Sequence, residues 1–528
     1  MMFHILVADP LSEEGLKPLR EHSDINVSVQ TELSPEALLA EIPTYDALIV
    51  RSQTSVTAEL LEKADRLKII GRAGVGTDNI DLQAATQRGI IVVNAPHGNT
   101  NSAAEHTMAM IMSLSRNIPQ AYHSLKQHEW NRKKFLGTEL KGKTLGIVGL
   151  GRIGTEVAFR AKGQRMQVIA FDPFLTEEKA EKIGIGYGSL EEVLKAADFI
   201  TVHTPLLKNT RHLINAEAFK LMKDNVQIVN CARGGIIDEE ALYDAIVSGK
   251  VAGAALDVFE NEPALENKLL TLPEVIATPH LGASTVEAQE NVAIDVSQDI
   301  ACYLQGSAAA NPVNIPAISN EHMGKVKPYF LLAEKLGEFV SYQSDEAIEE
   351  IVLNYAGDVS EYEVTPLSRI AIKGLLKRHL GDHVNEVNAM YLAEKKGITV
   401  HENKTKTTKG FTNLLRIDIV TGKRTVTAAG TLLNGLGPRI VHVDQFHVDV
   451  TPTGHIVLIH HRDQPGVIGK MGNLLGTHHI NIATMQVDRW DEGGKAIMLL
   501  KVDRHLEPDS ISALKALPEI EDVRTIDF

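Results

Sequence analysis

Residues 144–162 read TLGIVGLGRIGTEVAFRAK, and this stretch decides the fold. The apolar run TLGIV leads directly into the glycine pattern G-L-G-R-I-G, and a helical segment, TEVAFRAK, follows. Strand, glycine turn and helix in this order are typical of a dinucleotide-binding βαβ unit, because the turn lets backbone N–H groups at the helix N-terminus reach a pyrophosphate. The stretch predicts a doubly wound α/β domain whose phosphate turn contains Gly149, Gly151, Arg152, Ile153 and Gly154.

Asp172 follows the next apolar run, VIAF, and lies 172 − 154 = 18 residues beyond the last glycine of the turn. A carboxylate at that position can accept hydrogen bonds from both ribose hydroxyls and repels a 2′-phosphate. Asp172 therefore predicts NAD rather than NADP as the cofactor. The alternative is a simple turn residue before Pro173.

Two series of short apolar runs, each alternating with helical segments, indicate two such domains. The first series spans residues 1–98, and the second begins at residue 144. Two long helical segments, 102–118 and 284–306, join them. We expect residues 1–98 and 284–306 to form one domain and residues 99–283 an NAD-binding Rossmann-like domain, with a ligand in the cleft between them.

A small, polar, proline-containing linker, SAAANPVNIP at 307–316, follows the two βαβ series. The C-terminal half beyond it has a different order of predicted helices and strands. Residues 317–452 predict an intervening α+β domain and contain no catalytic constellation. Residues 455–528 follow the order β-α-β-β-α-β, which is typical of a ferredoxin-like unit. The expected fold is therefore two doubly wound domains, an intervening α+β domain and a ferredoxin-like domain.

The composition limits the function classes. A formal net charge of −15 argues against nucleic acid or anionic membranes as partners, and no apolar run approaches the ~18 residues of a membrane helix. Two cysteines exclude a disulfide framework and fit a reducing cytoplasm. The absence of C-x-x-C, H-E-x-x-H and G-x-S-x-G patterns predicts neither a metal site nor a serine hydrolase.

Arg233, Glu262 and His280 each follow an apolar run, in the strings NCARGGIID, FENEP and TPHLGAS. Each is therefore expected at the carboxyl end of a strand, where open α/β sheets bind ligands. A histidine can take and return a hydroxyl proton, a carboxylate behind it fixes its tautomer, and an arginine fork holds a substrate carboxylate. Although a histidine taken alone is more often structural, this set predicts hydride transfer on a 2-hydroxy acid.

These motifs resemble the D-2-hydroxyacid dehydrogenase family over essentially the whole chain, most specifically over residues 140–285. The resemblance implies further residues along the cofactor, with Asp257 near the carboxamide of nicotinamide, and it adds Arg233 and His280 to the cofactor contacts. Cys231 is expected to be a small buried residue rather than a nucleophile. The further cofactor residues are Val75, Thr204, Cys231, Ala232, Asp257, Gly282 and Ala283.

The substrate is expected to be phosphorylated. Arg51 ends a strand in LIVRSQT, and Arg72 stands beside Gly74 in the glycine-rich turn GRAGVG. The resemblance implies that these residues and Arg233 bind 3-phospho-D-glycerate, which is oxidised to 3-phosphooxypyruvate at the start of L-serine biosynthesis. A glyoxylate or hydroxypyruvate reductase of the same family and a non-catalytic NAD-sensing binding protein are the alternatives, and solvated surface residues are the alternative for the two arginines.

The last domain resembles an ACT regulatory domain, through H-R-D-Q-P-G at 461–466 and I-N-I at 480–482. This resemblance implies an amino-acid effector, with L-serine as the candidate by analogy with serine-regulated relatives, bound by His461, Asp463 and Asn481. Asp463 stands where the serine-binding pattern of the family has asparagine, so a purely structural role in dimerisation is the alternative. A cytoplasmic homodimer or homotetramer is expected.

Overall fold

The computed structural model describes residues 2–318, 320–408 and 410–528. Its first sheet is parallel throughout, in the strand order β2-β1-β3-β4-β5. Its strands are almost continuous apolar runs because helices cover both faces: α1 and α12 pack on one, and α2, α3 and α4 on the other. The strands are β1 (Phe3–Val7), β2 (Ile25–Val29), β3 (Ala47–Val50), β4 (Ile69–Arg72) and β5 (Ile91–Asn94), and the helices are α1 (Glu13–Arg20), α2 (Pro35–Glu41), α3 (Ala58–Lys63), α4 (Leu82–Gln87) and α12 (Val286–Leu304).

The second sheet is also parallel, in the order β12-β11-β10-β9-β6-β7-β8. Strand β6 pairs with both β7 and β9, so the strand order reverses at β6, and the predicted glycine turn follows this strand. Such a reversal opens a crevice at the carboxyl ends of the strands. The strands are β6 (Thr144–Val148), β7 (Gln167–Phe171), β8 (Gly186–Tyr187), β9 (Phe199–Val202), β10 (Val226–Asn230), β11 (Val251–Leu256) and β12 (Val275–Ala277), with helices α7 (Arg152–Gly163), α8 (Glu177–Ile183), α9 (Leu190–Ala196), α10 (Ala216–Leu221) and α11 (Glu239–Val247).

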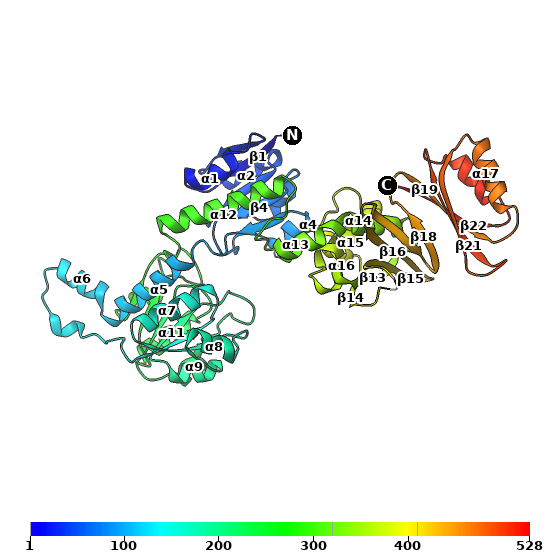
Figure 1. Ribbon diagram of the computed structural model, residues 1–528. Coiled ribbons are helices and arrows are strands. Elements are labelled where there is room, and N and C mark those ends of the chain that lie inside the picture. Colours follow the sequence, from blue (N-terminus) through cyan, green and yellow to red (C-terminus); the bar gives the residue numbers. More distant parts are fainter. Residues whose placement is uncertain (1, 319, 409) are drawn as a thin grey trace.

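Two long helices connect these sheets (Figure 1). Helix α5 (Thr100–Ser115) packs Met108, Ile111 and Leu114 into the core of the second sheet. Helix α12 returns to the first sheet, where Val292 and Val296 join its core. The short helix α6 (Ile118–Lys126) projects away from both sheets in Figure 1.

A mixed third sheet follows, in the order β14-β13-β15-β16-β17-β18, with helices α14, α15 and α16 beside it. It is docked on the first domain, because Asn385 Nδ2 donates to Gly89 O at 2.7 Å and the buried Val387 belongs to the core of that domain. The elements are α13 (Asn320–Val326), α14 (Phe330–Ser341), β13 (Ile348–Gly357), α15 (Thr365–Leu380), α16 (Ala389–Lys395), β14 (Thr399–Thr405), β15 (Asn413–Thr421), β16 (Thr425–Leu433), β17 (Gly437–Val443) and β18 (Phe446–Val450).

The fourth sheet is antiparallel, in the order β20-β21-β19-β22, and its β-α-β-β-α-β sequence of elements confirms the prediction. Side chains of β19 alternate between its faces. Val457 and Ile459 pack under α17 and α18, whereas Ile456 and Leu458 join the core of the third domain. The elements are β19 (His455–Arg462), α17 (Val467–Thr477), β20 (Ile482–Arg489), β21 (Lys495–Val502), α18 (Pro508–Lys515) and β22 (Ile520–Asp527).

The fold class predicted from the sequence is thereby confirmed: two parallel-sheet domains precede two domains of mixed and antiparallel sheet (Figure 1). In the described part of the chain, no helix is both long enough and apolar enough to cross a membrane.

Candidate active site

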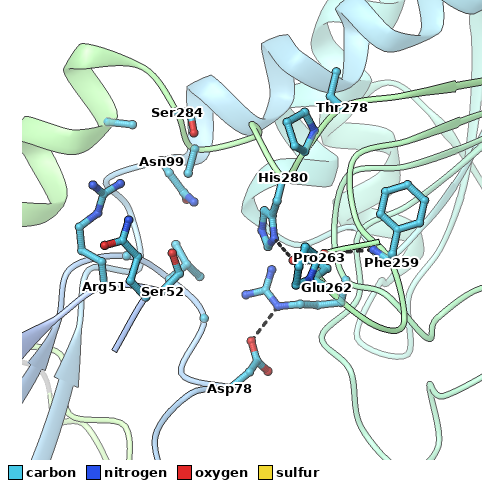
Figure 2. A pocket seen from close by; sticks show the side chains of 18 of the residues that line it. Arg51, Ser52, Asp78, Asn99, Phe259, Glu262, Pro263, Thr278, His280 and Ser284 are labelled. Carbon is cyan, nitrogen blue, oxygen red and sulfur yellow. Dashed lines mark hydrogen bonds and ion pairs between the residues drawn. The ribbon is translucent and has the colours of Figure 1, made fainter. Parts of the chain in front are cut away.

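A cavity of about 760 Å³ lies between the two parallel-sheet domains (Figure 2). Its walls come from loops that follow the strands of both sheets. The first domain contributes Arg51, Arg72 and Gly74, and the second contributes the predicted chemical residues Arg233, Glu262 and His280. The structure therefore brings together the residues that the sequence predicted for chemistry and for phosphate binding.

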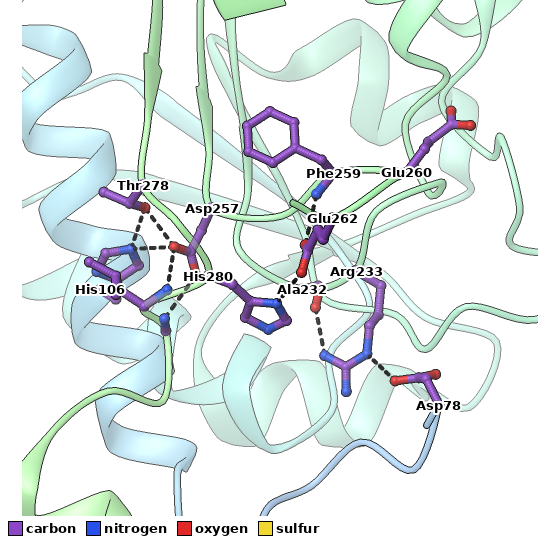
Figure 3. Close-up of polar contacts among 12 residues, drawn as sticks. Asp78, His106, Ala232, Arg233, Asp257, Phe259, Glu260, Glu262, Thr278 and His280 are labelled. Carbon is purple, nitrogen blue, oxygen red and sulfur yellow. Dashed lines mark hydrogen bonds and ion pairs between the residues drawn. The ribbon is translucent and has the colours of Figure 1, made fainter. Parts of the chain in front are cut away.

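His280 and Glu262 form a hydrogen-bonded pair in this cavity (Figure 3). The distance between His280 Nδ1 and Glu262 Oε2 is 2.8 Å, and Phe259 N donates to Glu262 Oε1 at 3.0 Å. The hydrogen bond to Glu262 raises the pKa of His280 above its ordinary value. Burial acts to raise the pKa of Glu262, but the hydrogen bonds from His280 and Phe259 outweigh it and lower that pKa overall. With Nδ1 engaged, Nε2 is the atom of His280 that can exchange a proton.

The backbone at His280 adopts a left-handed conformation with φ of 55°. The buried Asp257 fixes it, because His280 N donates to Asp257 O at 2.9 Å and the Asp257 carboxylate accepts from Leu281 N at 2.7 Å and Gly282 N at 2.8 Å. Thr278 Oγ1 and His106 Nε2 lie 2.6 Å and 3.2 Å from Asp257 Oδ1 (Figure 3). Both oxygens of Asp257 are thus engaged in holding the loop that carries His280.

Arg233 is held from both domains. Its Nε donates to Asp78 Oδ2 at 3.0 Å across the cleft, and its Nη1 donates to Ala232 O at 2.7 Å (Figure 3). A Cβ at Gly76 would lie only 2.0 Å from Arg233 Nη2, so the absence of a side chain at position 76 makes room for the guanidinium. These contacts leave Nη1 and Nη2 protons for a substrate carboxylate.

Arg51 and Arg72 place positive charge at the wall of the cavity. Among the residues that the structure describes, neither guanidinium lies within ion-pair distance of a carboxylate. Arg51 Nη1 donates to Pro10 O at 3.3 Å, Arg72 Nη1 donates to Ala73 O at 3.5 Å, and Arg72 Nε is buried without a hydrogen-bond partner. Burial, and after it the charge of Arg233, lowers the pKa of Arg72 to about 10. A Cβ at Gly74 would lie 1.6 Å from Arg72 Nη1, so only glycine leaves this guanidinium its place. Two unpaired arginines favour an anion on this side of the cavity.

A second cavity, of about 800 Å³, lies beside the first one. Its features fit a dinucleotide: the space in front of Gly151 is open, and the Thr204 hydroxyl is buried without a hydrogen-bond partner. Most of the cofactor residues predicted from the sequence line this cavity. They are Val75, Gly151, Arg152, Ile153, Thr204, Cys231, Ala232, Arg233, Asp257, His280, Gly282 and Ala283.

Three predicted cofactor residues do not line the cavity but shape the turn beside it. A Cβ at Gly149 would lie 2.7 Å from the backbone of His203, and one at Gly154 would lie 2.2 Å from Gly149 O, so both positions serve close packing. Asp172, at the end of β7, accepts from Leu150 N at 2.9 Å through Oδ2. This bond holds its carboxylate next to the glycine turn.

Cys231 is 7% exposed, and burial followed by the charge of Asp257 raises its pKa to about 12. A thiol with that pKa stays protonated near neutral pH, so it is not a nucleophile. The sequence reasoning did not identify Asp78 or His106. Asp78 lies two residues after the glycine-rich turn GRAGVG, but its contact with Arg233 depends on how the two domains pack. His106 faces Asp257 only because α5 packs on the second sheet.

The three predicted effector residues each contact a different neighbour. His461 is 2% exposed, its Nδ1 lies 2.9 Å from Arg462 O, and its Nε2 is buried without a partner. Asp463 Oδ2 pairs with Arg489 Nη1 at 2.7 Å, and Asn481 Nδ2 donates to Asp503 Oδ2 at 2.8 Å. The structure therefore does not bring these three side chains together through direct contacts.

Three segments of the chain match known families. Residues 108–282 match the NAD binding domain of D-isomer specific 2-hydroxyacid dehydrogenases, residues 325–444 the D-3-phosphoglycerate dehydrogenase intervening domain, and residues 455–519 the ACT domain. The D-3-phosphoglycerate dehydrogenase of Bacillus subtilis is 49% identical, with 100% of both chains covered. The D-3-phosphoglycerate dehydrogenase of Methanocaldococcus jannaschii is 46% identical, also with 100% of both chains covered.

The chain also resembles a solved D-lactate dehydrogenase of Aquifex aeolicus, crystallised with NAD and lactic acid. The identity is 31% and the TM-score is 0.53, with 60% of this chain and 100% of that chain covered.

Proposed function

The chain belongs to the D-3-phosphoglycerate dehydrogenase family, and on that premise we propose how its cleft oxidises 3-phospho-D-glycerate to 3-phosphooxypyruvate. It is an NAD-dependent dehydrogenase, and this reaction is the first step of L-serine biosynthesis. One observation carries the assignment of roles: the His280–Glu262 pair, Arg233 and two unpaired arginines line a single cavity.

His280 is the proposed general base. NAD, when bound, supplies the nicotinamide ring that accepts a hydride from the carbon bearing the hydroxyl group. His280 Nε2 takes the hydroxyl proton, and Glu262 stabilises the imidazolium that results. In the reverse direction the same imidazolium returns the proton to the carbonyl oxygen.

Arg233 is proposed to hold the substrate carboxylate with its Nη1 and Nη2 protons, which orients the reacting carbon and polarises the carbonyl of the product. Asp78 positions Arg233 from the opposite wall of the cleft. Arg51 and Arg72 are proposed to bind the phosphate group, with Gly74 giving Arg72 its room.

The proposed cofactor contacts divide by part of the dinucleotide. The turn from Gly149 to Gly154, with Arg152 and Ile153, would hold the pyrophosphate, and Asp172 would accept hydrogen bonds from the ribose hydroxyls. The remaining lining residues would hold the adenine and nicotinamide ends. Because its oxygens are engaged, Asp257 acts mainly by fixing the loop of His280.

NADH formation from a panel of D-2-hydroxy acids tests this function. We expect 3-phospho-D-glycerate to give the highest kcat/KM with NAD. Equal efficiency with glycolate or D-glycerate would favour the reductase alternative, and no turnover of any acid would favour an NAD-binding sensor.

For regulation we propose that the ACT domain binds a small amino acid, with L-serine as the first candidate. The ammonium group of the ligand would replace Arg489 as the partner of Asp463, and Asn481 would exchange Asp503 for the ligand's polar groups. His461 would line the floor of this site. Calorimetric titration with L-serine, together with initial rates, tests the proposal. The absence of both binding heat and inhibition would contradict it.

We further propose a cytoplasmic homodimer or homotetramer. Two cysteines without a disulfide, Cys231 and Cys302, agree with a reducing compartment. Light scattering coupled to size-exclusion chromatography measures the assembly, and a monomer at enzyme concentrations used in assays would contradict it.

A further inference from the structure

The last domain contains a cluster of two histidines and one aspartate that belongs neither to the cleft nor to the proposed effector site. His455 is the first residue of β19, His505 lies between β21 and α18, and Asp527 is the last residue of β22. His455 Nδ1 lies 2.6 Å from Asp527 Oδ1, and His505 Nδ1 lies 2.7 Å from Asp527 Oδ2. The two rings are 6.3 Å apart between centroids.

The ligand atoms of this cluster all lie within 4.8 Å of one another. Within residues 2–318, 320–408 and 410–528, it is the one group of three or more His, Cys, Asp or Glu side chains with that property. We propose that His455, His505 and Asp527 form a binding site for a divalent transition-metal ion of the Zn²⁺ type.

The donor set determines the class of ion. Two imidazole nitrogens and one carboxylate oxygen suit Zn²⁺, Co²⁺ or Ni²⁺, whereas Ca²⁺ and Mg²⁺ prefer oxygen ligands alone. The side chains are 39%, 52% and 39% exposed, so an ion can enter from solvent and water can complete its coordination. With neutral imidazoles, the trio carries one negative charge, which further favours a cation.

The observed distances describe the trio in its hydrogen-bonded form. Each Nδ1–H donates to Asp527, and an ion would require the Nδ1 lone pairs instead. A neutral imidazole supplies that lone pair by moving its proton to Nε2, and a charged imidazole must release one proton, so binding weakens as the pH falls. Tetrahedral coordination with bonds of about 2.0–2.1 Å separates ligand atoms by roughly 3.3 Å. Side chains this exposed can move apart by that small amount.

A metal ion here would join three separate segments of the domain. Strands β19 and β22 already pair at His455 and Asp527, and the ion would tie the loop before α18 to them. The neighbouring Phe528 stacks on Phe339 of the third domain, with ring centroids 6.5 Å apart. The ion should therefore stabilise the C-terminal domain and fix Phe528 against the third domain. It takes no part in the hydride transfer.

The test uses the full-length chain without an affinity tag, after treatment with a chelator. Zn²⁺ titration by calorimetry should show one saturable site per chain, and Co²⁺ should give the intense visible absorption of a low-coordinate site. His505→Gln and His455→Gln should each weaken Zn²⁺ binding by at least about tenfold. A matched control is His401→Gln, because the exposed His401 pairs only with Glu350, at 3.5 Å, and should leave Zn²⁺ binding unchanged.

Two results would overturn the proposal. One is Zn²⁺ binding of equal strength in wild type and in His505→Gln, with folding of both checked by circular dichroism. The other needs no variant: in wild type, Co²⁺ retains the weak spectrum of the hydrated ion at saturating protein.

Discussion

The two halves of the molecule use charged residues differently. In the N-terminal half, Arg51, Arg72, Arg233, Glu262 and His280 are far apart in sequence but line one cavity. In the C-terminal half, the predicted effector residues Asp463 and Asn481 pair with separate neighbours, Arg489 and Asp503. Parallel strands bring all their carboxyl ends to one edge of a sheet, whereas neighbouring antiparallel strands end at opposite edges. The comparison teaches that parallel strands can gather residues from distant segments at one edge of a sheet, and the role that we propose for the C-terminal half is regulation.

The largest expected effect in the cleft comes from His280→Ala. Removing the proton acceptor should reduce kcat by about 10²–10⁴, while NADH binding stays nearly intact because eleven of the twelve predicted cofactor residues that line the second cavity are unchanged. Stopped-flow turnover and NADH fluorescence titration measure the two quantities. Unchanged turnover would remove His280 from the mechanism.

Glu262→Gln should have a smaller effect, a roughly 10–100-fold loss corresponding to one hydrogen bond to a charged group. The hydrogen bond to Glu262 raises the pKa of His280, so its loss lowers that pKa. Oxidation requires neutral His280, and its rate rises with pH through this pKa. The acidic limb of the kcat/KM profile should therefore move to lower pH, and the rate of reduction should decline at lower pH than in wild type. A profile that does not move would separate Glu262 from the proton transfer.

Asp172→Ser tests the cofactor side of the cleft, and its expected effect on kcat/KM is smaller again. The substitution removes both the ribose contacts and the negative charge, so kcat/KM for NAD should fall roughly tenfold and that for NADP should rise. Initial rates with each cofactor give the selectivity ratio. If wild type already prefers NADP, the role proposed for Asp172 is wrong.

The C-terminal half provides the smallest expected effect on basal turnover. Arg489→Gln removes an exposed ion pair, whose contribution is small, so turnover without amino acid should stay within about twofold of wild type. The response to L-serine should change, because Asp463 loses its present partner. A tenfold drop in basal turnover would contradict the claim that catalysis depends on the N-terminal half alone.

Local sequence patterns were sufficient for the elements and for most residues at strand ends. The glycine turn at 149–154 and the apolar runs before Arg233 and His280 depend only on short-range periodicity and backbone geometry. The sequence did not predict the roles of Asp78 and His106, because their contacts with Arg233 and Asp257 form only when separate elements pack together.

His461 is a different case. It lies two residues after Ile459 and four after Val457, on the face of β19 that packs under the helices, so the two-residue period of a strand could have predicted its burial. The strand period could not have predicted the contacts of Asp463 and Asn481, because their partners, Arg489 at the end of β20 and Asp503 just after β21, lie in other segments of the chain.

The proposed function depends most directly on recognition of a phosphate by Arg51 and Arg72. The decisive measurement is the ratio of kcat/KM for 3-phospho-D-glycerate to that for D-glycerate, in wild type and in Arg51→Gln. We expect a large ratio in wild type and a fall of roughly tenfold in the variant, caused by slower turnover of the phosphorylated acid alone. A wild-type ratio near one, or an equal loss for both acids, would contradict it.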